Sequence, residues 1–132
     1  MSLRKLPDYR LKQKILYIDK TPAATLISYG DLYMEDGALS DALDFYTKAS
    51  HRTGMQKIKD LALEKGDAFL FRGAAKSLNI ELRDADWKDL GRRAMDQKKY
   101  LFARQALENA HDAEALNALA AVMKAEEAKQ SA

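Results

Sequence analysis

Two stretches of this chain repeat one spacing of small and large residues. Gly30 and Gly91 each follow a bulky residue directly, and each precedes an alanine by twelve positions. The matched sets are Leu26, Tyr29, Gly30, Tyr33, Ala42, Tyr46 and Ala49, and then Trp87, Leu90, Gly91, Ala94, Ala103, Leu107 and Ala110. A spacing that recurs at a fixed offset predicts a stack of helix pairs.

The remaining pattern indicates an all-α chain. Only two prolines and six glycines interrupt the 132 residues, and apolar residues recur at intervals of three and four. We expect about eight helices. They are a leading helix that ends near Asp19, then residues 22–35, 39 or 40 to about 50, 55–65, 68–78, 87–95, 99–110 and 112 to about 129.

The leading helix is expected to be amphipathic. Leu11, Ile15 and Ile18 form its predicted apolar face, and Lys12 and Lys14 are placed on the face toward water. We interpret this helix as a cap on the stack, because an open repeat exposes apolar surface.

The glycines predict where paired helices approach each other closely. Two helix axes reach the short end of the usual 8 to 10 Å range only where facing side chains are small. We therefore expect Gly30 to face Ala42, and Gly91 to face Ala103.

At these residues the chain resembles the tetratricopeptide repeat family, whose helix-turn-helix units of about 34 residues carry Trp, Leu-Gly, Tyr, Ala, an aromatic or Leu, and Ala. The later copy has Ala94 where the family prefers Tyr, and the earlier copy has Leu26 in place of Trp. Gly30 and Gly91 are 61 residues apart, whereas two full units need about 68. We therefore expect a shortened middle pair whose first helix is truncated by Gly66.

The resemblance implies an α-α superhelix of antiparallel helix pairs in one domain, residues 1–132. Its expected parts are a leading capping helix over residues 1–20, repeats over 23–56, 57–83 and 84–111, and a C-terminal capping helix over 112–132.

The resemblance also implies a non-catalytic module that binds a peptide segment of a partner protein in a groove lined by the first helix of each pair. In this register the groove residues are Ile27, Asp31, Met34, Glu35, Lys59, Leu63, Lys88, Arg92, Met95 and Asp96. Ile27 and Asp31 stand where a chaperone-type carboxylate clamp would have Lys and Asn, so that clamp is not supported.

Composition argues against several other classes. There is no cysteine, and the sequence has neither a phosphate-cradling glycine loop, nor a nucleophile elbow, nor a His-Glu-x-x-His arrangement. We therefore expect no catalytic residues, metal or cofactor. The net charge of +2 does not favour binding of nucleic acid. The basic cluster of Arg92, Arg93, Lys98, Lys99 and Arg104 is also interleaved with acidic residues, which weakens its positive field.

Two expectations concern assembly and location. An alternative to peptide binding is a structural subunit that self-associates through the stripe of Leu116, Leu119 and Met123. The longest apolar run, residues 118–123, is well below the roughly 18 that a membrane span needs, and residues 15–18 are too few for a secretory leader. We expect a cytoplasmic protein.

Overall fold

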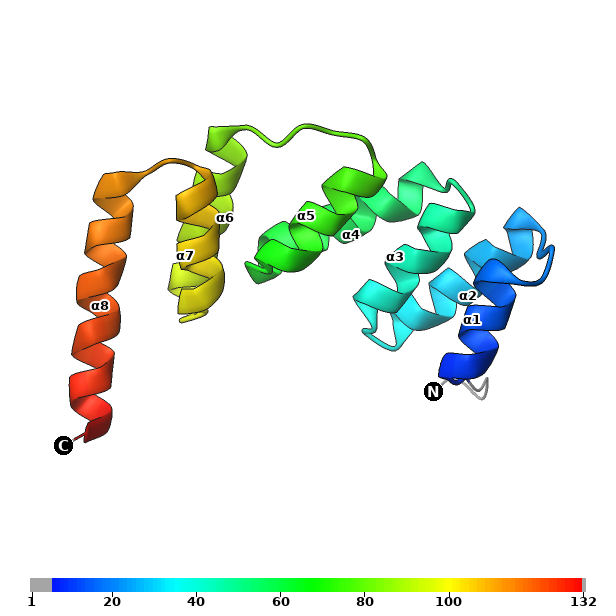
Figure 1. Ribbon diagram of the computed structural model, residues 1–132, viewed down its shortest axis with the longest axis horizontal. Helices are drawn as coiled ribbons and strands as arrows, with labels where there is room; N and C mark the ends of the chain where they lie inside the picture. Colours follow the sequence, from blue (N-terminus) through cyan, green and yellow to red (C-terminus); the bar gives the residue numbers. More distant parts are fainter. Residues whose placement is uncertain (1–5, 132) are drawn as a thin grey trace. The chain divides into compact units, whose positions relative to one another are not determined.

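The described part of the chain, residues 6–131, forms eight α-helices and no strand in the computed structural model of Figure 1. The all-α prediction is confirmed. Residues 1–5 and 132, at the ends of the two expected capping helices, lie outside the described residues. The helices are α1 (Tyr9–Tyr17), α2 (Ala23–Glu35), α3 (Leu39–Lys48), α4 (Arg52–Lys65), α5 (Ala68–Ser77), α6 (Asp84–Asp96), α7 (Tyr100–Asn109) and α8 (Ala113–Ser131).

Six of these helices end in one and the same hydrogen-bonded turn. One of the first two residues beyond each of these helices has a positive φ, and the next amide donates to the carbonyl five residues before it, which satisfies carbonyls that the helix leaves open. In α2, for example, the amide of Ala38 donates to Tyr33 at 2.9 Å. The six left-handed residues are Gly37, Ser50, Gly66, Asn79, Lys98 and His111.

These turns divide the central helices into three pairs of equal internal length. The left-handed residue of the second helix follows that of the first by 13 positions in α2 with α3, α4 with α5, and α6 with α7. This equal interval gives a register in which each residue of one pair has a counterpart in the others. The adjacent, packed helix pairs are those of an α-α repeat.

The expected truncation of the middle pair at Gly66 is wrong. α4 has 14 residues, against 13 in both α2 and α6. The short period arises instead from the connection between α3 and α4, which is only residues 49–51, because α4 begins at Arg52. The boundary that we expect between residues 56 and 57 therefore falls inside α4.

The glycines of the outer pairs face large side chains rather than the expected alanines. A methyl group on Gly30 would lie 2.5 Å from Cε1 of Tyr46, and one on Gly91 would lie 2.8 Å from Cδ2 of Leu107. Ala42 and Ala103 are fully buried four residues earlier. Each glycine thus leaves room for one bulky side chain of the second helix.

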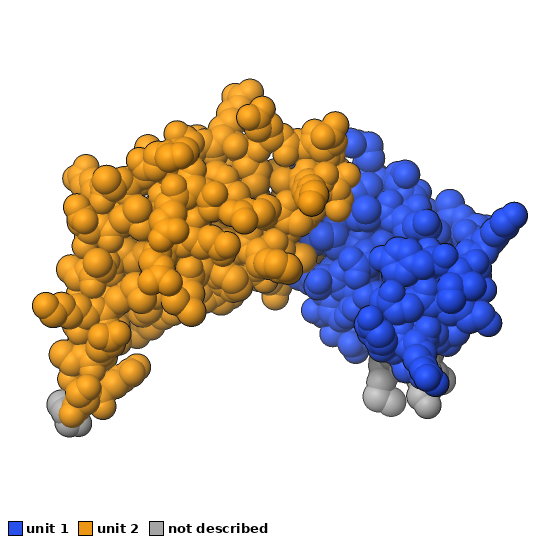
Figure 2. Space-filling model, in the orientation of Figure 1, with its two compact units in different colours: residues 1–58 blue, residues 59–132 orange. Residues whose placement is uncertain are grey.

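The sequence predicts a single domain, and the packing separates the chain into two compact units, residues 1–58 and 59–132 (Figure 2). The division falls within α4.

The first unit is built around an aromatic cluster between α2 and α3. The ring of Phe45, which is fully buried, lies 5.3 Å from the Tyr33 ring and 5.5 Å from the Tyr29 ring. The Tyr33 hydroxyl donates to the carbonyl of Pro7 at 3.0 Å. These contacts tie the segment before α1 to the paired helices.

α1 turns a different face inward from the one predicted. Lys12, Ile15 and Leu16 are buried, whereas Ile18 is 75% exposed and Leu11 is 46% exposed. The reason lies on α3, because the Lys12 ammonium donates to Asp41 and Asp44, both at 2.7 Å. Burial lowers the pKa of Lys12, but these hydrogen bonds outweigh burial and raise it overall.

The second unit packs α6 against α7, and α7 against α5 and α8. Its core includes Ala94, Ala103, Leu107 and Leu119, with Leu116 and Met123 packed on the same cluster. Phe71 of α5 meets Trp87 of α6 edge to face, with ring centroids 5.6 Å apart.

We expect Gly66→Ala to destabilise the chain more than Gly37→Ala. Both glycines have a positive φ, which costs an alanine about 1 to 2 kcal/mol. A methyl group on Gly66 would also lie 2.7 Å from Cα of Ala94, whereas nothing lies within 4 Å of one on Gly37. The close contact should add about 1 to 3 kcal/mol in urea unfolding. Equal losses would show that Gly66 is not in contact with α6.

We expect the double change Asp41→Asn with Asp44→Asn to cost more stability than Lys12→Met. The double change leaves a buried ammonium without a carboxylate, a loss of about 1 to 3 kcal/mol. Lys12→Met removes the buried charge. The carboxylates of Asp41 and Asp44, 43% and 47% exposed, remain hydrated in that variant. Urea unfolding at neutral pH measures both losses, and the reverse order would contradict this account of Lys12.

Candidate functional site

In the first unit, the four predicted groove residues lie on α2. Ile27 and Met34 are half-buried, and Glu35 is exposed. Asp31 accepts a hydrogen bond from the Tyr46 hydroxyl at 2.6 Å. Burial raises the pKa of Tyr46, and the bond to Asp31 raises it further. Asp31 therefore already holds α2 to α3, which leaves Ile27, Met34 and Glu35 as the open part of this set.

In the second unit, four predicted residues share one face of α6. Lys88, Arg92 and Asp96 are exposed at intervals of four, and Met95 is half-buried against the cluster of α7 and α8. Both signs of charge thus flank one apolar side chain.

Arg92 is held in place by an acidic neighbour on the same helix. Its Nη2 donates to Oδ1 of Asp89 at 2.8 Å, and Nε of Arg93 donates to the same oxygen at 3.1 Å. The hydrogen bond from Arg92 lowers the pKa of Asp89, burial opposes this, and Arg93 lowers it further. Arg92 remains 69% exposed, so its other donors face outward.

The two predicted residues of α4 have different surroundings. Lys59 stands at the register position of Gly30 and Gly91, and its Nζ lies 5.3 Å from the centroid of the Phe71 ring. This places Lys59 in the contact between α4 and α5. Leu63 is half-buried at the register position of Met34 and Met95.

The carboxyl ends of α4 and α6 meet through three contacts. Gln97 Nε2 donates to the carbonyl of Glu64 at 2.9 Å, and Lys99 Nζ donates to that of Lys65 at 2.6 Å. Gly66 lies directly against the backbone of Ala94. We call Leu63, Lys88, Arg92, Met95 and Asp96 the first-helix face of the second unit; it is the candidate site for a partner segment.

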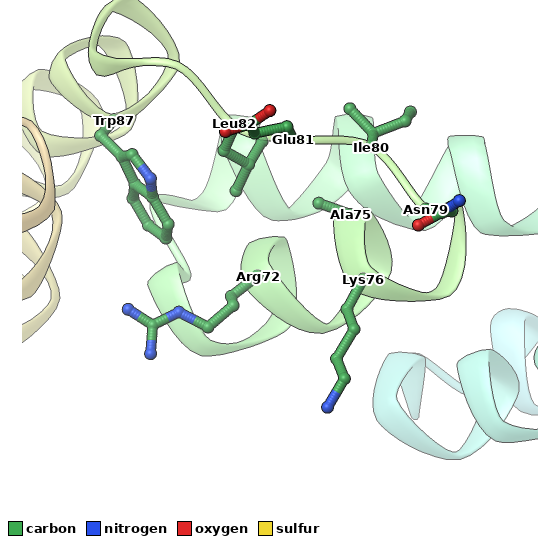
Figure 3. A pocket seen from close by; sticks show the side chains of 8 residues that line it. All are labelled: Arg72, Ala75, Lys76, Asn79, Ile80, Glu81, Leu82 and Trp87. Carbon is green, nitrogen blue, oxygen red and sulfur yellow. The ribbon is translucent and has the colours of Figure 1, made fainter.

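A second feature of this unit was not predicted from the sequence. An open hollow of about 620 Å³ lies between α5, the connection that follows it, and the start of α6 (Figure 3). Its walls include Arg72, Ala75, Lys76, Ile80, Leu82 and Trp87. The spacing identifies Trp87 only as a packing residue, and no sequence pattern indicates that the connection leaves space beside it.

Four of the five basic residues considered for nucleic acid have partners within the chain. Arg92 and Arg93 share Asp89, and Nε of Arg104 lies 3.8 Å from Oε1 of Glu108. Lys99 donates to a backbone carbonyl, as described above. The contacts with Asp89 and Glu108 offset part of the positive charge of the patch.

Neither histidine lines the hollow or belongs to the first-helix face. His51 packs its ring 5.3 Å from that of Tyr46, and His111 Nδ1 lies 3.4 Å from Asp84 at the surface. Among residues 6–131 there is no group of three or more His, Cys, Asp or Glu that could hold a metal ion. No helix in the described part is long and apolar enough to cross a bilayer.

The titration of Asp89 should report on its arginine partners. A carboxyl with a lowered pKa stabilises the fold above its ordinary pKa and loses that contribution as the pH falls through the lowered value. By carbon-13 NMR, we expect Asp89 to titrate below the ordinary 3.8 and Arg92→Gln to move its midpoint upward. Arg104→Gln, on α7, should leave it unchanged. An Asp89 midpoint that is the same in the parent and in Arg92→Gln would contradict the pairing of Arg92 with Asp89.

Comparisons with protein-family models, curated proteins and solved structures give no match. The resemblance to the tetratricopeptide repeat family therefore rests on the spacing of residues within this chain.

Proposed function

We propose that this chain is a non-catalytic protein-interaction module that binds a peptide segment of a partner protein through the exposed faces of its first helices. The observation that carries the proposal is the 13-residue interval between left-handed residues, which recurs in three helix pairs. Helical repeats of this kind present rows of side chains on successive helices, and such rows commonly bind other proteins. The tetratricopeptide repeat resemblance implies the same use of the first helix.

The chemistry of the first-helix face defines the partner segment. Leu63 and Met95 offer apolar contact, and methionine adapts its shape to different side chains. Lys88 and the outward donors of Arg92 favour carboxylates beside that apolar contact. The expected ligand is a segment in which acidic residues flank apolar ones.

Preorganisation supports binding of this kind. Each first helix ends in the same hydrogen-bonded turn, and Arg92 is already oriented by Asp89. A receptor face that is ordered before binding loses little conformational entropy when the ligand arrives. The ordering cost then falls mainly on the partner segment.

Self-association is the alternative, and its predicted surface is the stripe of Leu116, Leu119 and Met123 on α8. In the structure these three side chains pack on the same cluster as Ala103 and Leu107 of α7. The stripe is thus engaged within the chain, which favours peptide binding over this alternative. A molar mass by light scattering that rises with protein concentration would favour self-association.

A peptide selected on the intact chain tests the proposal. We expect peptides enriched from a displayed random library to bind Lys88→Glu with Arg92→Glu about tenfold or more weakly, because two favourable charges become repulsive. Calorimetry measures the affinity, and thermal unfolding verifies that both variants fold.

The matched control reverses two exposed lysines elsewhere, Lys124→Glu with Lys129→Glu on α8. We expect this control to bind the selected peptides as the parent does. Equal affinity of the parent and both double variants would place the peptide site outside the first-helix face.

A further inference from the structure

The hollow beside Trp87 is open to solvent and combines apolar walls with a charged rim. Trp87 is 6% exposed at one wall, and the apolar side chains of Ala75, Ile80 and Leu82 complete the others. Its volume of about 620 Å³ is within the range of ligand sites.

Two cations border this hollow, and one of them is oriented by the tryptophan. The Arg72 guanidinium lies 5.4 Å from the Trp87 ring, and Lys76 projects from the next turn of α5 (Figure 3). Among the residues that the structure describes, neither cation forms an ion pair with a carboxylate. Glu81 is the single acid in the lining, so the rim favours a negative ligand.

The connection beside the hollow leaves backbone donors open. The Ile80 amide is used in the turn that closes α5, and the Arg83 amide donates to Asp86 at 2.9 Å. Between them, the amides of Glu81 and Leu82 donate to no protein group in the described part of the chain. Both residues lie outside any helix, and since an extended chain pairs with alternate residues, one of the two amides can bond to the backbone of such a segment.

We propose that the Trp87 hollow, defined by Arg72, Lys76, Ile80, Glu81, Leu82 and Trp87, docks an extended acidic segment of another polypeptide. A carbonyl of that segment accepts from one of the open amides of Glu81 and Leu82, an aromatic or aliphatic side chain enters beside Trp87, and neighbouring carboxylates meet Arg72 and Lys76. The apolar walls favour a polypeptide side chain, and a rim with two cations and one acid is too weakly charged to hold a nucleic acid backbone.

This site extends the proposed function to a second surface and does not depend on the first. It shares no side chain with the first-helix face, so either site can fail while the other binds. Variants of Arg72 and Lys76 report on the hollow, and variants of Lys88 and Arg92 report on the first-helix face.

Trp87 is the one tryptophan of the chain, so its fluorescence observes this site directly. The probe is the synthetic peptide acetyl-Glu-Asp-Phe-Glu-Val-Asp-amide, titrated into the full chain. We expect a saturable change in emission, with amide shifts at Glu81 and Leu82 in two-dimensional NMR. The same peptide with each acid replaced by lysine should give neither signal.

Charge reversal identifies the residues that hold the probe. Arg72→Glu should weaken binding about tenfold to a hundredfold, as expected for a lost hydrogen bond between charged groups. The matched control is Arg104→Glu, the exposed arginine at the same register position of α7, which should bind as the parent does. If Arg72→Glu lowers the melting temperature, Lys76→Glu is the second test, since its side chain is exposed.

Three outcomes would overturn the proposal. They are the absence of a saturable Trp87 signal, equal binding by the parent and both α5 variants, and shifts confined to residues of the first-helix face. Tighter binding of an oligonucleotide than of the acidic peptide would identify a polyanion site instead.

Discussion

The hydrogen bond that closes six of the helices is the interaction on which the rest of the structure depends. In each case an amide beyond the helix donates to a carbonyl five residues earlier, and the residue before that amide is left-handed. Because this turn recurs 13 residues later within each pair, it sets the length of the second helix and the register of its contacts. The first-helix face takes its position from that register, whereas the Trp87 hollow lies at the connection between two pairs.

The backbone of the pairs is constant, but the helix that carries the bulky residue at the contact differs. It is the second helix in the outer pairs and the first helix in the middle pair. Gly30 and Gly91 on the first helix accommodate Tyr46 and Leu107 on the second. At the same register position the middle pair has Lys59, and its counterpart on the second helix is Ala75. Since a packed interior conserves volume rather than side-chain identity, a large residue on either helix satisfies the contact. Lys59 is the large residue of the middle pair at this position, and its ammonium lies 5.3 Å from the centroid of the Phe71 ring.

Much of the fold could be predicted from the sequence, because apolar periodicity and local turn signals depend on near neighbours. The helix expected over residues 22–35 is α2, and that expected over 99–110 is α7. The burial of Lys12 could not be predicted, since its partners Asp41 and Asp44 are about thirty residues away. The Trp87 hollow depends on the connection between α5 and α6, and apolar periodicity does not predict the path of a connection. The groove residues follow from the resemblance to the tetratricopeptide repeat family. That resemblance does not determine which side chains face a neighbouring helix, so it did not show that Lys59 lies against Phe71 of α5.

The left-handed turns also have a consequence for the protein's thermal resistance. Four of the six, Ser50, Asn79, Lys98 and His111, have side chains in a backbone region that disfavours any Cβ atom, and all four are exposed. Glycine would relieve that steric conflict, although it also gives the unfolded chain more freedom. The fold therefore carries an unused reserve of stability at these solvent-facing corners, and Asn79 is the one of the four that also lines the Trp87 hollow.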